Sequence, residues 1–262
     1  MIWRLICLFS AIFALTSSIS ANGNPQTALT DVRTLLGAAY YRDDVVKLDE
    51  IVEQLTPFAT NTTDWHILYN AAFAHYHLAN VLSDSDTQTA KEHADRAIDY
   101  LKHADTINPD NVEIVALLGA VHGRRAGFGA LASLRYGRPS MRESARAIAL
   151  DSTNSRALIV RGQILMYAPA LFGGSVEEAR RLLNTAVEAA ADESSSDSLI
   201  VEWGGAADAH TFLALLELCA GNPAEAHRHA SLALELRPDY HYVREWILPR
   251  IADKADSGDH HE

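Results

Sequence analysis

Histidine is abundant in this sequence, and paired histidines are the first residues to weigh as ligands of a metal ion. Two His-x-His pairs occur, at His75/His77 and His227/His229. On a helix, residues two apart point to different faces, whereas the ligands of one ion must converge. Neither His93 nor His103 has a ligand partner at the i+4 position of a helix. We therefore expect histidines that are solvated or at the core edge, with no metal site and no cofactor.

Nucleophilic and acid–base catalysis would need other constellations. The sequence has no G-x-S-x-G elbow, no S-x-x-K motif and no Cys/His motif. Its adjacent carboxylates, Asp43-Asp44 and Glu177-Glu178, do not converge when they are neighbours on a helix, and they are typical of a solvated face. We expect a protein that is not an enzyme.

Anion binding is a third chemistry, and its candidates are Arg124, Arg125 and Arg156. These arginines stand in an acidic chain with a formal net charge of −12. They could receive a carboxylate or an acidic peptide. The alternative is ordinary surface arginines paired with nearby acids. The acidic balance itself argues against nucleic acid or an anionic membrane surface as partner, because phosphate binding needs clustered Lys and Arg.

The elements that must position these side chains are clearest between residues 209 and 240. Ala214 is a small residue that lets two helices approach closely, Gly221 suits a tight turn, and Pro223 suits the first position of a second helix. Pro238 then stops that helix. The spacing resembles the tetratricopeptide repeat, with a second small-residue face at Ala226, Ala230 and Ala233.

One such unit cannot bury its own apolar face, so we expect others. Leading residues at Trp65, Val112 and Ser155 predict about four repeats over 61–240, with long insertions at Gly127–Pro139 and Ala168–Ser175. A helical hairpin over 22–60, ended by Pro57, precedes them. A capping helix over 241–255 and a disordered tail over 256–262 follow. The fold class is therefore an all-α tetratricopeptide-repeat solenoid.

Residues 1–21 are typical of a secretory signal peptide. Arg4 gives a positive start, Leu5 to Leu15 an apolar core, and small residues up to Ala21 a cleavage region. The alternative, a retained anchor, would need an apolar run of roughly 20 residues. We expect a periplasmic or secreted protein without stable membrane insertion. Its one remaining cysteine, Cys219, lies in an apolar helix and predicts a buried, inert thiol.

Residues 154–251 carry a second pattern, a P-x-x-F-G-G loop followed by a W-G element. In this sequence, the loop contains Pro169, Phe172, Gly173 and Gly174, and the W-G element is Trp203-Gly204. The combination resembles a family of bacterial secreted tetratricopeptide-repeat proteins, and more loosely the helical component associated with some TRAP transporters. The glycines permit positive φ or close backbone approach, and Phe172 suits a plug between helices.

In this repeat class the concave surface binds partners and is lined mainly by the first helix of each unit. We expect a periplasmic scaffold or adaptor that binds a protein or peptide there. The alternative is a small-solute-binding accessory component of a transport system, with the insertions closing a pocket. The candidate partner-binding residues are His66, Asn70, Phe73, Arg124, Arg156, Gln163, Tyr167 and Phe172.

Overall fold

The computed structural model describes residues 25–192 and 197–258, and no described residue forms a strand. The predicted signal segment 1–21 lies outside the described residues, as do residues 259–262 of the predicted tail. The elements are α1 (Pro25–Arg42), α2 (Val45–Ala59), α3 (Trp65–Val81), α4 (Thr87–Ile107), α5 (Val112–Ala126), α6 (Ala130–Leu150), α7 (Ser155–Tyr167), the 3-10 turn η1 (Ala170–Phe172), α8 (Val176–Asp192), α9 (Ala206–Ala220), α10 (Pro223–Leu236), the π-helical turn η2 (Val243–Ile247) and α11 (Leu248–Gly258).

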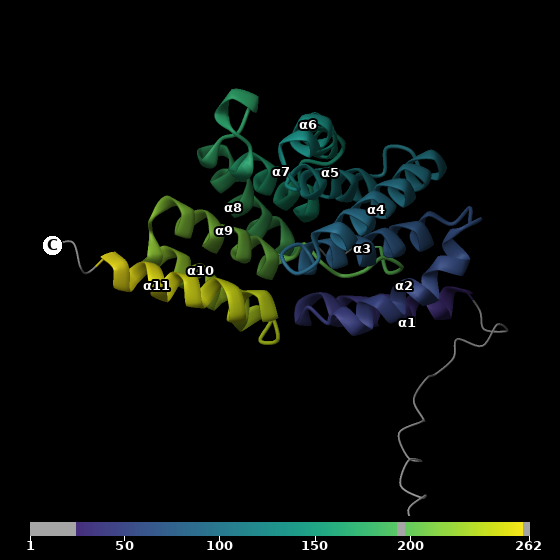
Figure 1. The fold of residues 1–262 in the computed structure, drawn as a ribbon, viewed down its shortest axis with the longest axis horizontal. Helices are drawn as coiled ribbons and strands as arrows, with labels where there is room; N and C mark the ends of the chain where they lie inside the picture. Colours follow the sequence, from purple (N-terminus) through teal and green to yellow (C-terminus); the bar gives the residue numbers. More distant parts are fainter. Residues whose placement is uncertain (1–24, 193–196, 259–262) are drawn as a thin grey trace, which may run out of the picture.

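Successive helices pack as pairs, and the pairs stack on one another. The helices α1 to α10 form five pairs in chain order, and α2 packs on α3, α4 on α5, and α8 on α9. Figure 1 shows this array, with α11 at its C-terminal end. No helix among the described residues is long and apolar enough to cross a membrane.

Short polar side chains begin most of these helices. Asp64 accepts a hydrogen bond from the backbone N–H of His66 and so caps the start of α3. Asn111 and Asn154 cap α5 and α7 in the same way. At the other end of the chain, Gly221 ends α9 with a φ of 82°, a conformation that costs glycine little.

Two prolines lie inside helices, contrary to the sequence reading. Pro57 does not end the second helix, since α2 continues to Ala59, which is buried. Pro139 lies within α6, so most of the predicted insertion at Gly127–Pro139 is helix from Ala130 onward. Packing of the flanking residues against neighbouring helices outweighs the hydrogen bond that each proline removes.

The buried face of α6 carries no large apolar side chain. Its buried residues are small or polar, namely Ser140, Glu143, Ser144 and Ala147. The cause is the close approach of α5. A Cβ on Gly119 would lie 3.1 Å from the backbone nitrogen of Ser144, and Ser140 Oγ donates a hydrogen bond to the Gly119 carbonyl over 2.9 Å.

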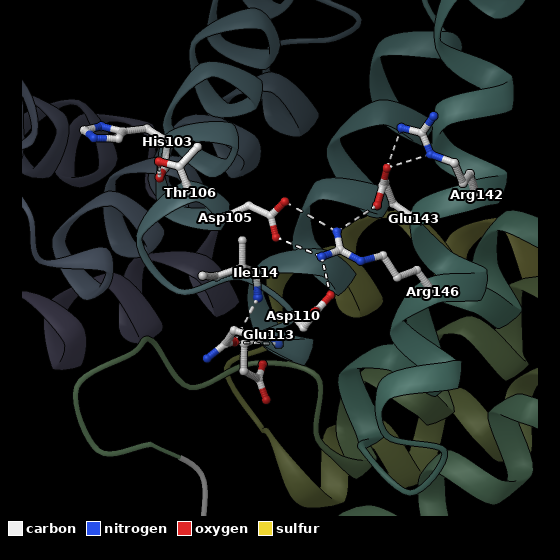
Figure 2. A network of polar contacts seen from close by, with 10 residues as sticks. His103, Asp105, Thr106, Asp110, Glu113, Ile114, Arg142, Glu143 and Arg146 are labelled. Carbon is white, nitrogen blue, oxygen red and sulfur yellow. Dashed lines mark hydrogen bonds and ion pairs between the residues drawn. The ribbon is translucent and has the colours of Figure 1, made fainter.

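Helices α4 and α6 are tied together by one arginine with several carboxylates. Figure 2 shows the Arg146 guanidinium between Asp105, Asp110 and Glu143, with nitrogen–oxygen distances of 3.2, 2.7 and 3.4 Å. These hydrogen bonds raise the pKa of Arg146, so it stays charged. Asp110 adopts a positive φ of 61° in the turn before α5, which brings its carboxylate to this network.

The chain closes on itself, because its first helix meets its last ones. The Arg42 guanidinium lies 3.1 Å from Asp239, and His241 lies 3.0 Å from Asp43. Figure 1 shows the end of α1 beside α10 and the turn that leads to α11. The first helices of the pairs, α1, α3, α5, α7 and α9, therefore surround a common inner face.

Candidate functional site

The inner face is partly filled by the chain's own connection between α8 and α9. We call residues 197–205 the inner segment. Asn70 on α3 holds it through both ends of its amide: Nδ2 donates to the Leu199 carbonyl and Oδ1 accepts from the Val201 N–H, each over 2.8 Å. This is how an asparagine would hold the backbone of a bound peptide.

Aromatic contacts bury the rest of the inner segment. The Trp203 ring lies 5.4 Å from the Phe73 ring, and its indole N–H donates to the Tyr69 hydroxyl over 2.9 Å. At the other end, His66 Nε2 lies 2.9 Å from Asp197. The predicted residues His66, Asn70 and Phe73 therefore do face inward, and they contact this chain rather than open solvent.

Arg156 is 2% exposed and lies under the same segment. Its guanidinium lies 3.1 Å from Glu113 and 6.0 Å from the centre of the Trp203 ring. Gly204 allows this approach, with a φ of 71° and no room for a Cβ, which would lie 2.4 Å from Arg156 Cγ. Arg125 likewise pairs with Asp95, over 2.7 Å. Arg125 and Arg156 are therefore paired with acids of this chain, which was the alternative to an anion-binding patch.

One buried carboxylate bonds to the first helix, to the inner segment and to the residues just before η2. Asp208 accepts hydrogen bonds from the hydroxyls of Tyr40, Tyr41 and Tyr240 and from the backbone N–H of Gly204, over 2.6 to 3.1 Å. Burial and this carboxylate raise the pKa of all three phenols, which therefore remain donors. Nothing in this group is free to react, so its role is to position the surrounding helices.

Arg124 differs from the other two arginines that the sequence singled out. It has no carboxylate oxygen within 4.0 Å among residues 25–192 and 197–258. Its Nε donates to the Ala79 carbonyl over 3.3 Å, and its guanidinium lies 4.8 Å from the centre of the Phe128 ring. Burial lowers the pKa of Arg124, while the nearby Tyr76 phenol and Asp84 oppose that shift.

Three phenols from three elements surround this arginine electrostatically: Tyr76 on α3, Tyr167 on α7 and Tyr242 before η2. We call these four residues the Arg124 cluster. Tyr167 keeps 59% of its surface exposed, yet burial of its surroundings raises the pKa of its phenol. The cluster thus places one charge and several phenols in partly dry surroundings, a setting that suits a carboxylate attached to an apolar group.

Two other expected site residues lie close to Tyr167 in the sequence. Gln163 is partly buried on α7, one turn before Tyr167. Phe172 is 63% exposed on η1, so its predicted role as a plug between helices is wrong. The next two glycines act as predicted: Gly173 has a φ of 88°, and a Cβ on Gly174 would overlap the Ala168 carbonyl at 1.7 Å. Because the loop turns tightly here, Phe172 is left on its outer side.

The prediction of a buried thiol is also wrong. Cys219 is exposed near the end of α9, and it contributes to the electrostatic surroundings of Tyr167. The helix is apolar overall, but Cys219 and Ala220 in its last turn are exposed. The residue is therefore an accessible thiol close to the Arg124 cluster.

The sequence reading missed two histidine pairs, because it compared positions only within one helix. His75 and His93 approach each other from α3 and α4, with their Nδ1 atoms 2.7 Å apart, and His210 and His229 do the same from α9 and α10 at 3.0 Å. Each pair joins the two helices of one repeat. In the described part of the chain, no three His, Cys, Asp or Glu side chains gather as a metal-ligand group.

Comparisons with known proteins agree with this architecture. No protein-family model and no curated protein sequence matches the chain. Among solved structures it is similar to the HusA haemophore from Porphyromonas gingivalis, with a TM-score of 0.60 and 22% identity over 73% of this chain and 92% of that one. It is also similar to a thermophilic TPR protein of Thermus thermophilus, with a TM-score of 0.52 and 16% identity over 88% and 97%.

These likenesses confirm the predicted tetratricopeptide-repeat α-solenoid. At such identities they concern the fold alone. The resemblance to a secreted protein family, based on the P-x-x-F-G-G loop, stays a prediction.

Proposed function

We propose that this protein is a scaffold or adaptor of the tetratricopeptide-repeat type, and that its partner binds at the Arg124 cluster. The partner is a protein segment that offers a carboxylate next to an apolar or aromatic side chain. The observation that carries the proposal is the state of Arg124. It is a partly buried cation without a carboxylate oxygen within 4.0 Å among the described residues, and three phenols lie near enough to affect its pKa.

The position of the inner segment favours the Arg124 cluster over the part of the inner face near Asn70. The half of the inner face near Asn70 and Trp203 already holds nine residues of the chain, numbered 197–205, in the manner of a bound peptide. A partner that bound there would have to displace buried Ile200, Val201 and Trp203. The Arg124 cluster needs no such displacement, because Tyr167 is already exposed.

A photo-crosslinking experiment tests the proposal in cells that make the protein. A benzophenone amino acid replaces Tyr167, and adducts are identified by mass spectrometry. We expect one dominant protein adduct, which Arg124→Gln abolishes and Arg181→Gln leaves intact. Arg181 is a suitable control because its side chain is 64% exposed and pairs only with Glu178 on its own helix. Adducts that persist in Arg124→Gln contradict the site.

A second candidate function is binding of a small planar carboxylate, such as haem. Two observations favour it: a structural neighbour is named a haemophore, and the Arg124 cluster combines one cation with several phenols. An arginine suits a propionate, and a tyrosine can ligate haem iron. Titration of the purified protein with haem gives a saturable absorbance change in this case, reduced in Tyr167→Phe and Arg124→Gln. No saturation excludes this function and leaves the crosslinking result to decide the first.

We further propose that the protein acts in the periplasm or outside the cell, on the strength of residues 1–21. Fractionation of cells that express the full chain tests this. Mass spectrometry of the mature N-terminus should place the cleavage near Ser20 or Ala21. A protein that keeps Met1 and stays with the cytoplasmic fraction contradicts the assignment.

A further inference from the structure

A cavity of about 400 Å³ lies between α4, α5 and α6, away from the Arg124 cluster. Arg124 and Arg125 are neighbours on α5, and neighbouring residues of a helix project about 100° apart. Arg124 accordingly bonds to α3, whereas Arg125 faces α4 and the cavity. The cavity is lined by Asp95, Ile98, Asp99, Lys102, His122, Arg125, Arg135, Tyr136 and Pro139.

One buried group in this wall has no partner. His122 is 6% exposed, and its Nδ1 has no hydrogen-bond partner among the residues that the structure describes. The Tyr136 ring lies nearly parallel to the imidazole at 5.9 Å. Burial lowers the pKa of His122 to about 4, so at neutral pH the imidazole is uncharged. Buried polar atoms are nearly always bonded, so this orphan atom leaves an imidazole with unused hydrogen-bonding capacity in the wall of the cavity.

The charges around the cavity favour an anion. Asp95 is already engaged: Arg125 holds both of its oxygens, over 2.7 and 3.2 Å, and the Tyr136 hydroxyl lies 3.3 Å away. Lys102 and Arg135 have no carboxylate oxygen within 4.0 Å in the described ranges 25–192 and 197–258. Apart from the Asp95–Arg125 pair, the cavity wall therefore carries two positive charges, Lys102 and Arg135, and one negative charge, Asp99.

We propose that this cavity is a second ligand site, which takes a small organic anion through its carboxylate or phosphate group. Lys102 and Arg135 attract the charge at the mouth, and the neutral imidazole of His122, which lines the cavity, donates a hydrogen bond to it inside. Ile98 and Pro139 supply apolar surface beside the ligand's carbon atoms. This site is independent of the proposed function, since it shares no residue with the Arg124 cluster.

The test follows the His122 side chain by NMR in protein labelled with ¹⁵N-histidine. Inorganic phosphate and succinate serve as separate probes at constant ionic strength and pH. We expect the His122 signals to shift saturably with at least one probe, while exposed His103 on α4 serves as an internal reference. A response to phosphate alone assigns a phosphate ligand, and one to succinate alone a carboxylate ligand.

Two variants separate binding from a general effect of salt. Lys102→Met/Arg135→Met removes the two cavity cations that have no carboxylate partner among the described residues, both at exposed positions, and should weaken the response at least tenfold. Arg138→Met removes an exposed cation of α6 outside the cavity and should leave it unchanged. Thermal unfolding checks that both variants are folded. A linear, unsaturable shift, a shift equal to that of His103, or an unchanged response in the double variant would overturn the proposal.

Discussion

The hydroxyl of Tyr40 donates a hydrogen bond to Asp208 over 2.6 Å, although the two residues lie 168 positions apart in the chain. Tyr41, Tyr240 and the Gly204 N–H donate to the same carboxylate. One buried carboxylate thus joins the first helix, the inner segment and the C-terminal helices. In a repeat array, each repeat usually contacts only the repeats next to it. In this protein, the first helix also contacts the C-terminal elements.

Replacing Asp208 with alanine should therefore destabilise the whole protein. The variant leaves buried tyrosine hydroxyls without their acceptor, and hydrogen bonds to charged groups are the stronger ones. We expect a loss of about 3 kcal/mol in the free energy of unfolding, measured by urea titration. Asp239→Ala, which removes only the exposed partner of Arg42, should cost less than about 1 kcal/mol. Equal effects of the two variants would contradict this role.

Asn70→Ala should loosen the inner segment. The substitution removes the group that donates to the Leu199 carbonyl and the group that accepts from the Val201 N–H. A loss of about 1–3 kcal/mol corresponds to about fivefold to 150-fold faster amide hydrogen exchange at Val201. Asn184→Ala, whose amide bonds only to its own helix on an exposed face, is the matched control. Unchanged exchange at Val201 would show that the apolar contacts alone hold the segment.

The stability of the protein should fall as the pH drops below about 6.5. Burial lowers the pKa of His75 to about 3 and the pKa values of His122 and His229 to about 4. The unfolded chain takes up protons at these sites near pH 6.5, whereas the folded protein does not, so acid favours unfolding. At pH 5 each histidine costs about 2 kcal/mol. Urea titrations at pH 7.5, 6 and 5 measure this, and equal stabilities at all three would contradict it.

The Arg146 network should tolerate lysine poorly. Arg146→Lys keeps the charge but loses the planar fork that reaches Asp105 and Asp110 together. We expect a loss of about 1–2 kcal/mol in the free energy of unfolding for Arg146→Lys, and more for Arg146→Ala. Arg181→Ala breaks a pair on one exposed helix face and should cost less than about 0.5 kcal/mol. A lysine variant as stable as the parent would show that charge alone suffices.

Local signals in the sequence predict the helix pairs well. Asp64 before Trp65, and Gly221 before Pro223, mark a helix start and a turn through interactions within a few residues. Pro57 and Pro139 mislead for the same reason, because packing against distant helices decides whether a helix continues past them. The close contact of Gly119 with Ser144 likewise depends on how two helices meet.

The candidate site is harder to predict, because its defining contacts join residues far apart in sequence. The helical register does place Asn70, Phe73 and Arg156 toward the inside. Nothing local indicates that residues 197–205 cover them, or that His75 pairs with His93. Which arginine lacks a carboxylate depends on the same distant contacts, and only the folded arrangement separates Arg124 from Arg125 and Arg156.

The inner segment also sets an order of events during synthesis. Helices α2 to α5 share a core with Ile200, Val201 and Trp203, which leave the ribosome long after them. Until then, the N-terminal half exposes Phe73 and Tyr69 without their covering residues. Contacts across 131 positions close slowly compared with those inside a helix pair. A newborn chain truncated before residue 197 should therefore be prone to aggregation, and nascent chains of this protein should depend on protection by chaperones.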